Sequence, residues 1–434
     1  MRECLVSDLA NLNPPLSRVP TDQTIVSFIS MGDVSESGSV VQHSEEPFGR
    51  VKTGFTRFQN GDILFAKITP CMENGKGALV SDLPSGVGCG STEFHVLRAK
   101  DTCCAAFLFQ HLQSRALRQK AELYMSGSAG QQRVPTEFFR RLRISAPRFA
   151  LQEKIAAILT SLDVAIENTE ALIEKHQQIK AGLMHDLYSR GVLPTGELRP
   201  SFNGARELFI NSEIGLIPQG WALRPAGQVC LLITKGTTPP SDEMFEAGEG
   251  VRFLRVDNLT FDGDIDFEAS TFRVARTIHH TTLARSRCIP GDVLTNIVGP
   301  PLGKLGLVRH THGDEVNINQ AIAVFRPGQS ILPEYLLGWL SSEMAKRWLL
   351  IRAKQTSGQV NFTLAMCQTL PVPVPPLEEQ RLIVQRQQHA GDVVEGEAAA
   401  LRKLRLQRLG LMQSLLTGAL PVKATSADVA MVDA

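Results

Sequence analysis

Residues Gly182-Leu183-Met184 return 228 positions later as Gly410-Leu411-Met412. At the same constant offset, residues 75–187 align with residues 303–415 without a gap, and 22 of the 113 positions are identical. Unrelated chains of ordinary composition would share roughly 6%. The chain is therefore interpreted as an internal duplication. Two equivalent units in one chain can be related by a pseudo-two-fold axis, which suits a target with two halves.

Composition makes this an ordinary globular chain without a strong electrostatic bias. Of its 434 residues, 43% are hydrophobic and 21% are charged, which predicts two or three domains with proper cores. The net charge is +1, so any contact with nucleic acid has to come from local basic patches. The eight cysteines include no Cys-x-x-Cys pair, which is typical of reduced thiols. No signal-peptide core follows Met1 and no apolar run approaches the ~18 residues of a membrane span, so we expect a cytoplasmic protein without a membrane partner.

The first part of each repeat is rich in glycine and carries short apolar runs that are typical of strands. These runs lie at 62–66 and 94–97 in the first repeat and at 292–294 and 321–325 in the second. One or two helices are expected at 105–124, and again at 333–353. The sequence therefore predicts an α/β (mixed α+β) fold in which one globular domain occurs twice.

The second part of each repeat is predicted to be a long helix that begins after a proline, Pro147 or Pro375. In both helices, apolar residues alternate at spacings of four and three, which indicates a coiled-coil seam with polar interruptions. The apolar seam residues are Ile155, Leu159, Leu162, Ile166, Ile173, Leu183 and Leu187 in the first helix, and Ile383, Val394, Leu401, Leu404, Leu411 and Leu415 in the second. Neither seam is apolar enough to stand alone, so we expect the two helices to pack against each other, antiparallel.

These patterns divide the chain into six segments. They are a first globular domain at 1–147, a helical spacer at 148–190, a linker at 191–217, a second globular domain at 218–374, a second helical spacer at 375–420 and a flexible tail at 421–434. The linker is assigned from its polar, proline- and glycine-bearing sequence, and the tail from its lack of periodicity.

Three motifs give this layout a resemblance to a known family. Residues 373–380, Pro-Val-Pro-Pro-Leu-Glu-Glu-Gln, resemble the proline-rich entry into the conserved helices of the specificity subunits of type I restriction-modification enzymes. Residues 217–221, Ile-Pro-Gln-Gly-Trp, are similar to the opening of that family's target recognition domains. Residues 357–362 resemble the segment just before such a domain returns to the helix. The first repeat departs from the entry motif and keeps only Pro147 and Gln152 of it.

The resemblance implies a DNA reader with no catalytic activity of its own. Each globular domain would be a target recognition domain that reads one half of a bipartite, asymmetric sequence in double-stranded DNA. The two long helices would set the spacing and would dock two methyltransferase subunits, and through these the restriction subunits. The seam residues are then the expected helix-pair and docking positions. No cofactor is expected on this chain, while S-adenosylmethionine, ATP and Mg are expected on the partner subunits.

Small, amide-bearing and basic residues supply the candidates for DNA contact, because base edges and phosphates are read by groups of fixed geometry. The candidates are Lys76, Gly130, Gln131, Gln132, Arg133, Thr234, Lys235, Thr237, Lys304, Ser357, Gln359 and Asn361. Simple turn chemistry is an open alternative for the two Gly-Gln loops, and a solvated hairpin lysine is one for Lys76 and Lys304. The arginines between Arg252 and Arg287 lie among aspartates, so most of them are expected in solvated ion pairs.

Two other classes of function compete with the DNA reader. A stand-alone DNA methyltransferase or nuclease would need diverged motifs: residues 299–305 are one residue short of a phosphate loop, with Leu305 where a magnesium ligand belongs. The histidines of residues 310–312 lack further metal ligands at useful spacing. A coiled-coil scaffold without a DNA role would leave the duplicated globular domains without a purpose.

Overall fold

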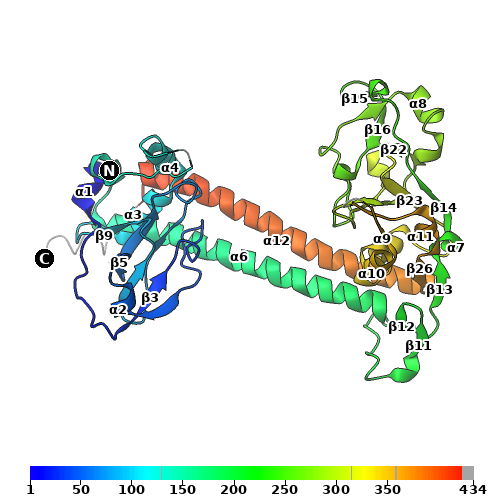
Figure 1. The fold of residues 1–434 in the computed structure, drawn as a ribbon, viewed down its shortest axis with the longest axis horizontal. Coiled ribbons are helices and arrows are strands. Elements are labelled where there is room, and N and C mark those ends of the chain that lie inside the picture. The colour runs from blue at the N-terminus through cyan, green and yellow to red at the C-terminus, as the bar shows by residue number, and fades with distance from the viewer. Residues whose placement is uncertain (129, 314, 357–358, 423–434) are drawn as a thin grey trace. The chain divides into compact units, whose positions relative to one another are not determined.

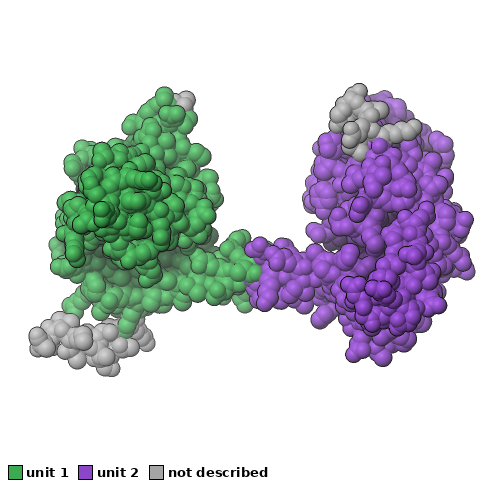
Figure 2. Space-filling view, turned by 60° about the horizontal axis from the view of Figure 1, so that its bottom comes forward, with its two compact units in different colours: residues 1–171, 398–434 green, residues 172–397 purple. Residues whose placement is uncertain are grey.

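The structure, a computed structural model whose elements Figure 1 labels, describes residues 1–128, 130–313, 315–356 and 359–422. It divides into two compact units, which Figure 2 colours separately. Unit 1 holds residues 1–171 and the chain from 398 onward, and unit 2 holds residues 172–397. Both boundaries fall inside a long helix, so each unit contains one globular domain and parts of both helices. Across the described ranges, no helix combines the length and the apolar character that a membrane crossing requires.

Unit 1 is a mixed α/β domain followed by the long helix α6. Its strands are β1 (Arg2–Leu5), β2 (Ala10–Leu12), β3 (Ile25–Ile29), β4 (Ser44–Pro47), β5 (Thr56–Gln59), β6 (Asp62–Ala66), β7 (Gly77–Leu79), β8 (Val87–Gly90), β9 (Phe94–Ala99) and β10 (Arg143–Ala146). Its helices are α1 (Val6–Leu9), α2 (Phe48–Val51), α3 (Ala105–Gln113), α4 (Arg115–Glu122), α5 (Thr136–Arg141) and α6 (Phe149–Ser189), the last of which continues into unit 2.

Unit 2 repeats this plan with more strands. They are β11 (Phe209–Ser212), β12 (Gly215–Pro218), β13 (Ala222–Pro225), β14 (Cys230–Lys235), β15 (Met244–Phe245), β16 (Val251–Leu254), β17 (Arg273–Val274), β18 (Arg287–Cys288), β19 (Val293–Asn296), β20 (Val298–Gly299), β21 (Leu305–Leu307), β22 (Val316–Ile318), β23 (Ile322–Pro327), β24 (Lys354–Thr356), β25 (Gln359–Asn361) and β26 (Pro371–Val374). The α-helices are α7 (Ala226–Val229), α8 (Arg276–His280), α9 (Pro333–Ser341), α10 (Glu343–Arg352), α11 (Leu364–Thr369) and α12 (Leu377–Thr417), which continues into unit 1. Short 3-10 turns lie at 206–208, 241–243, 256–258, 284–286 and 310–312.

The central sheets of the two domains have the same topology. The antiparallel order β2-β9-β6-β7 in unit 1 matches β14-β23-β19-β21 in unit 2. The register matches as well, since Leu64 lies opposite Val96 and Leu294 lies opposite Val324. A second sheet in each domain contains one parallel pair, β3 with β8 or β16 with β22. The duplicated mixed α/β fold that the sequence predicts is confirmed.

The helical segments expected at 105–124 and 333–353 are each two helices, broken at a serine. Ser114 ends α3 and begins α4, and Ser342 ends α9 and begins α10. Each serine has an extended backbone, and its hydroxyl accepts a hydrogen bond from the N–H three residues on, of Leu117 or Ala345. A serine that satisfies the free N–H groups of a new helix is a preferred N-cap, which explains a break at this position in both repeats.

The two long helices, 41 residues each, pair antiparallel within each unit, because residue numbers rise along one as they fall along the other. In unit 1, Asp163 forms an ion pair with Arg408, and Glu170 lies 2.6 Å from Arg405. In unit 2, His176 lies 2.8 Å from Glu397, and the Tyr188 hydroxyl lies 2.8 Å from the Gln387 side chain. Polar interruptions of the seam therefore find polar partners across it.

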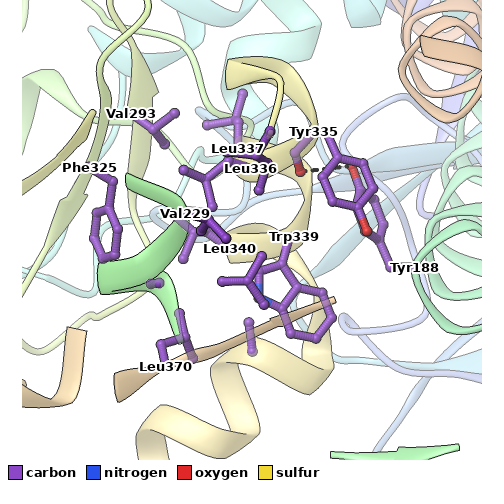
Figure 3. Close-up of a cluster of buried hydrophobic side chains, with 14 of the residues drawn as sticks. Tyr188, Val229, Val293, Phe325, Tyr335, Leu336, Leu337, Trp339, Leu340 and Leu370 are labelled. Carbon is purple, nitrogen blue, oxygen red and sulfur yellow. Dashed lines mark hydrogen bonds between the residues drawn. The ribbon is translucent and has the colours of Figure 1, made fainter. Parts of the chain in front are cut away.

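Each globular domain packs onto its end of the helix pair through a shared hydrophobic core. In unit 1 this core includes Ile155 and Leu159 of α6 and Leu415 of α12, together with α3 and α5 of the domain. In unit 2, Figure 3 shows Tyr188 of α6 facing Tyr335 of α9, with Trp339 beside them. Burial of this apolar surface holds domain and helices in one unit.

The segment at 191–217, assigned as a linker, is largely ordered structure. It contains the strands β11 and most of β12, which pair as a hairpin. Arg199 forms an ion pair with Glu379 in the first turn of α12, and the Val192 N–H donates to the same carboxylate. Ile217 and Trp221 are buried in the core of unit 2. The polar sequence of this segment does not reveal the contacts of Val192 and Arg199, because their partner Glu379 lies about 180 residues away in the chain.

Candidate nucleic-acid interface

The first Gly-Gln loop follows α4 and presents polar groups at the surface of unit 1. Gly130, Gln131 and Gln132 are exposed, and Arg133 is partly buried. The Arg133 guanidinium donates two hydrogen bonds of 2.9 Å to Glu93, and this contact holds the pKa of the Glu93 carboxyl below its usual value. The two glutamine side chains are thus the outward groups of this loop, while Arg133 is engaged with the domain.

The corresponding loop of unit 2 is only partly described. Ser357 lies outside the described residues. Gln359 belongs to β25, whose backbone pairs with β24, and Asn361 ends the same strand opposite Val298 of β20. Unit 1 has the same pairing as single bridges, in which Arg133 lies opposite Ile68 and Ser126, whereas unit 2 extends it into the three-stranded sheet β20-β25-β24.

Lys76 and Lys304 occupy the same place in the two domains, directly before β7 and β21. Both side chains are partly buried. The Lys76 ammonium donates to the carbonyl of Met31 at 3.0 Å, and that of Lys304 donates to the carbonyl of Val256 at 3.4 Å. Each lysine therefore ties its hairpin to the loop that follows a strand of the second sheet, and neither is the freely solvated side chain that we considered as an alternative.

Thr234 and Lys235 end the edge strand β14, and Thr237 follows in the loop. Lys235 is exposed, and the other two are partly buried. Thr234 also lines a shallow pocket together with Arg285, Arg287 and Arg326. Glu315 lines the same pocket and pairs with Arg287, while Asp292 pairs with Arg326, so Arg285 is the guanidinium there outside these two ion pairs. A guanidinium beside a hydroxyl has the chemistry that binds phosphate.

Of the arginines between Arg252 and Arg287 that the sequence predicts to lie mostly in ion pairs, the structure shows an ion pair for Arg287. Arg287 pairs with Glu315, and together with His279 it holds the pKa of the Glu315 carboxyl below its usual value. Arg252 and Arg255 lie over the rings of Phe267 and Phe272. Two of these side chains therefore pack on aromatic rings, where we had expected solvated ion pairs.

The seam residues named from the sequence lie between the two helices. All thirteen are buried or partly buried, while the positions around them are largely exposed. Ile155 and Leu159 are 1% and 0% exposed. The other faces of the two helices carry exposed aliphatic side chains, among them Leu172, Ile179 and Val393.

Both domains share one feature that the sequence analysis missed, a buried ion pair between two neighbouring strands of the central sheet. Arg98 forms an ion pair with Asp62, and Arg326 forms one with Asp292. Both carboxylates are fully buried. The signal was present, since Arg98 and Arg326 are among the identities at the 228-residue offset and each aspartate follows a glycine. Among the described residues, no three His, Cys, Asp or Glu side chains form a group that could hold a metal ion.

Comparison with known proteins identifies the duplicated unit. The sequence model of the type I restriction modification DNA specificity domain matches residues 7–178 and matches again at residues 218–403. The chain belongs to this family. Each match covers one globular domain and the helix that follows it, so the two matches correspond to the two repeats.

Individual relatives agree with the family. The type I restriction enzyme EcoAI specificity subunit of Escherichia coli is 37% identical over 185 residues, which is 41% of this chain and 31% of that protein. This chain thus aligns with about a third of that relative's length. One solved structure concerns the complex assembly and conformational transition of the type I R-M system, and a chain in it shares this fold. The TM-score is 0.60 at 21% sequence identity, and the match covers 96% of this chain and 98% of that chain. The S subunit of the type I system of M. genitalium gives a TM-score of 0.54 at 16% identity, over 98% and 96%.

Proposed function

We propose that this chain is the DNA-recognition subunit of a type I restriction-modification system. Each globular domain reads one half of a bipartite, asymmetric sequence in double-stranded DNA. The observation that carries this proposal is the repetition of one domain on one kind of helix, matched twice by the specificity-domain family. Two similar but diverged domains suit two half-sites of different sequence.

DNA contact is assigned to the loops and strand ends that present polar groups. Gln131 and Gln132 are exposed, and a glutamine amide can donate and accept at a single adenine edge. Thr234 and Lys235, beside the arginine-lined pocket, are assigned to phosphate. Phosphate contacts fix the position of the domain on the duplex, and base contacts select the sequence.

The helix pair is the proposed dock for two methyltransferase subunits, and through them for the restriction subunits. Leu172 and Ile179 are seven residues apart on α6, so they lie on one face, and they are 42% and 53% exposed. Exposed aliphatic side chains in a row on a helix favour contact with a partner protein. The chemistry then resides on the partners, which bind S-adenosylmethionine, ATP and Mg, and this chain is non-catalytic and cytoplasmic.

Mapping of methylated bases across the genome of a host that carries this chain with its methyltransferase tests the proposal. We expect one motif made of two short sequences with a fixed, unspecified gap. Modified bases at single contiguous sites would contradict it. Replacement of residues 1–147 by the first domain of another such chain should change one half of the motif and leave the other half unchanged.

The two competing functions are tested with the purified chain. A stand-alone methyltransferase transfers label from S-adenosylmethionine to DNA without a partner, and we expect no transfer by this chain alone. A scaffold without a DNA role gives a complex whose DNA affinity does not depend on sequence. We expect the complex to bind its motif selectively and to lose affinity steeply with salt, because several phosphates are contacted.

A further inference from the structure

A buried glutamine at the start of α6 connects this helix to the globular domain of unit 1. Gln152 lies in the first turns of α6 and is 2% exposed. Its side-chain oxygen accepts from the Cys104 N–H at 2.9 Å, at the N-terminus of α3. Its side-chain nitrogen donates to the carbonyls of Pro147 at 3.0 Å and Thr102 at 3.4 Å. One amide thus connects α6, the turn that leads into it and the loop that leads into α3.

The same connection exists in unit 2, atom for atom. Gln380 of α12 is fully buried, and its oxygen accepts from the Leu332 N–H at 2.8 Å. Its nitrogen donates to the carbonyls of Pro375 and Ser330, both at 2.9 Å. Every one of these residues stands 228 positions after its counterpart in unit 1. We call each arrangement of one glutamine and three backbone groups an amide clasp.

The clasp has been kept while its surroundings diverged. Between the proline and the glutamine, residues 148–151 read Arg-Phe-Ala-Leu and residues 376–379 read Pro-Leu-Glu-Glu, with no identity. The partner positions Thr102 and Cys104 differ from Ser330 and Leu332, yet they contribute only backbone groups, which any residue supplies. A side chain that uses backbone partners keeps its geometry while the neighbouring side chains change.

The clasp adds directional contacts to the apolar core that the domain shares with its helix, next to the hydrogen bond from Gln110 to Asp163. The core beneath Gln152 includes Ile155, Leu159 and Phe107. Apolar contact is non-directional, whereas a hydrogen bond weakens steeply when its angle changes. A buried amide with three partners is satisfied in one orientation of domain on helix, and a rotation of the domain would leave buried polar groups unpaired.

We infer that Gln152 and Gln380 are positioning residues that fix the angle of each recognition domain on its helix. Through this angle they determine how strongly the chain prefers one length of the gap between the two half-sites over others. The inference rests on the proposed function. We assign no DNA contact to these two glutamines. They act through the domain, whose orientation on the spacer decides whether both half-sites can be engaged together.

The test compares DNA duplexes that carry the mapped motif with its natural gap and with gaps one base pair shorter and longer. Initial methylation rates are measured with the complete complex of this chain and its methyltransferase. Gln152→Met and Gln380→Met keep the length of the side chain and remove the amide. Gln177→Met, on an exposed position of α6, is the matched control. Amide hydrogen exchange at Cys104 and Leu332 reports directly whether a clasp is broken.

In each clasp variant we expect the preference for the natural gap to fall by at least about tenfold, because the substitution removes three buried hydrogen bonds and the loss of one can change an equilibrium by roughly this factor. The control should keep the wild-type preference. An equal loss of methylation on all three duplexes would mean a merely structural role and would overturn the inference. An unchanged preference for the natural gap, together with fast amide hydrogen exchange at Cys104 that shows the clasp to be broken, would overturn it as well. If Gln152→Met does not fold, Gln152→Glu keeps the accepting oxygen and removes the donors, and the same outcomes decide. A wild-type complex without any gap preference would overturn the proposed function itself, whereas a strict wild type with equally strict variants overturns the inference alone.

Discussion

Arg326 donates two hydrogen bonds of 2.8 Å to the Asp292 carboxylate. This carboxylate is completely buried and lies directly before β19 of the central sheet of unit 2. The same carboxylate accepts from the Ile289 N–H at 2.9 Å, so it also closes the turn that enters β19. Gly291, with a φ of 94°, precedes it and allows that turn. Arg98 and Asp62 repeat the pair in unit 1, where Asp62 accepts from the Gln59 N–H.

Loss of this carboxylate should destabilise unit 2 strongly. Asp292→Ala leaves the Arg326 guanidinium and the Ile289 N–H without their partner, and we expect a cost of about 3 kcal/mol in the free energy of unfolding. Urea unfolding followed by tryptophan fluorescence measures it, since all three tryptophans lie in unit 2. Asp264→Ala removes an exposed ion pair with Arg309 and should change stability by less than about 1 kcal/mol. Equal effects of the two variants would contradict the argument.

Acid should weaken unit 1 through His111. Burial lowers the pKa of His111 from 6.5 to about 4. Below pH 6.5, His111 is protonated in the unfolded chain, whereas in the folded domain it stays neutral until about pH 4. The free energy of unfolding therefore falls as the pH falls from 6.5 to about 4. The shift corresponds to roughly 3 kcal/mol. His111→Leu should remove this part of the pH dependence in urea unfolding followed by circular dichroism, and His185→Leu, on an exposed position of α6, should not.

Two adjacent residues of α6 should respond very differently to truncation. Leu159 faces the seam and is 0% exposed, while Ile158 is 37% exposed. We expect Leu159→Ala to cost about 2–5 kcal/mol, because it leaves a cavity between helix and domain. Ile158→Ala should cost less than about 1 kcal/mol. Thermal unfolding of the two variants makes the comparison, and a similar loss in both would mean that Leu159 does not belong to the core that the helices share with the domain.

Assembly with the methyltransferase should depend on the outward face of the helix pair. Ile179→Asp places a charge on a side chain that is 53% exposed, so the fold of the chain should be kept. We expect at least about tenfold weaker assembly, because an apolar anchor at the centre of an interface typically contributes more than 1–2 kcal/mol. Gln178→Asp, also exposed, is the control. Co-purification with the methyltransferase at wild-type yield would exclude this face as the dock.

Contact of Lys235 with phosphate should appear in the salt dependence of DNA binding by the complex. Lys235→Met should lower the affinity equally for specific and non-specific duplexes. It should also reduce the slope of log K against log salt by about 0.9, the value for one phosphate. Lys403→Met, at an exposed position on α12, should change neither quantity. An unchanged slope for Lys235→Met would remove this residue from the interface.

Much of the architecture follows from local patterns in the chain. The strands at 62–66 and 94–97, and the four-three spacing from Ile155 to Leu187, are short-range regularities that each report one element. Their recurrence 230 residues later for the strand at 62–66, and 228 residues later for the other two patterns, then predicts that the domain occurs twice. These inferences need no knowledge of distant contacts, because periodicity and turn residues act over a few neighbouring positions.

The site depended on contacts that no local pattern encodes. The sequence offers Arg133 and Lys76 as candidates for DNA contact, and the structure adds that Glu93 and the Met31 carbonyl are hydrogen-bond partners of these side chains. Whether a polar side chain faces outward is decided by what the fold brings against it, and those partners lie 40 and 45 residues away.

By itself, the sequence determined that one mixed α/β domain is built twice, each time on a long helix with an incomplete seam. Only the tertiary structure decided that Gln152 and Gln380 bind backbone groups about 50 residues earlier in the chain, and that two aspartates are buried under arginines. The physical reason is range. Helix and strand periodicity is a property of neighbouring residues, whereas a buried hydrogen bond is defined by two segments that meet only when the chain has folded.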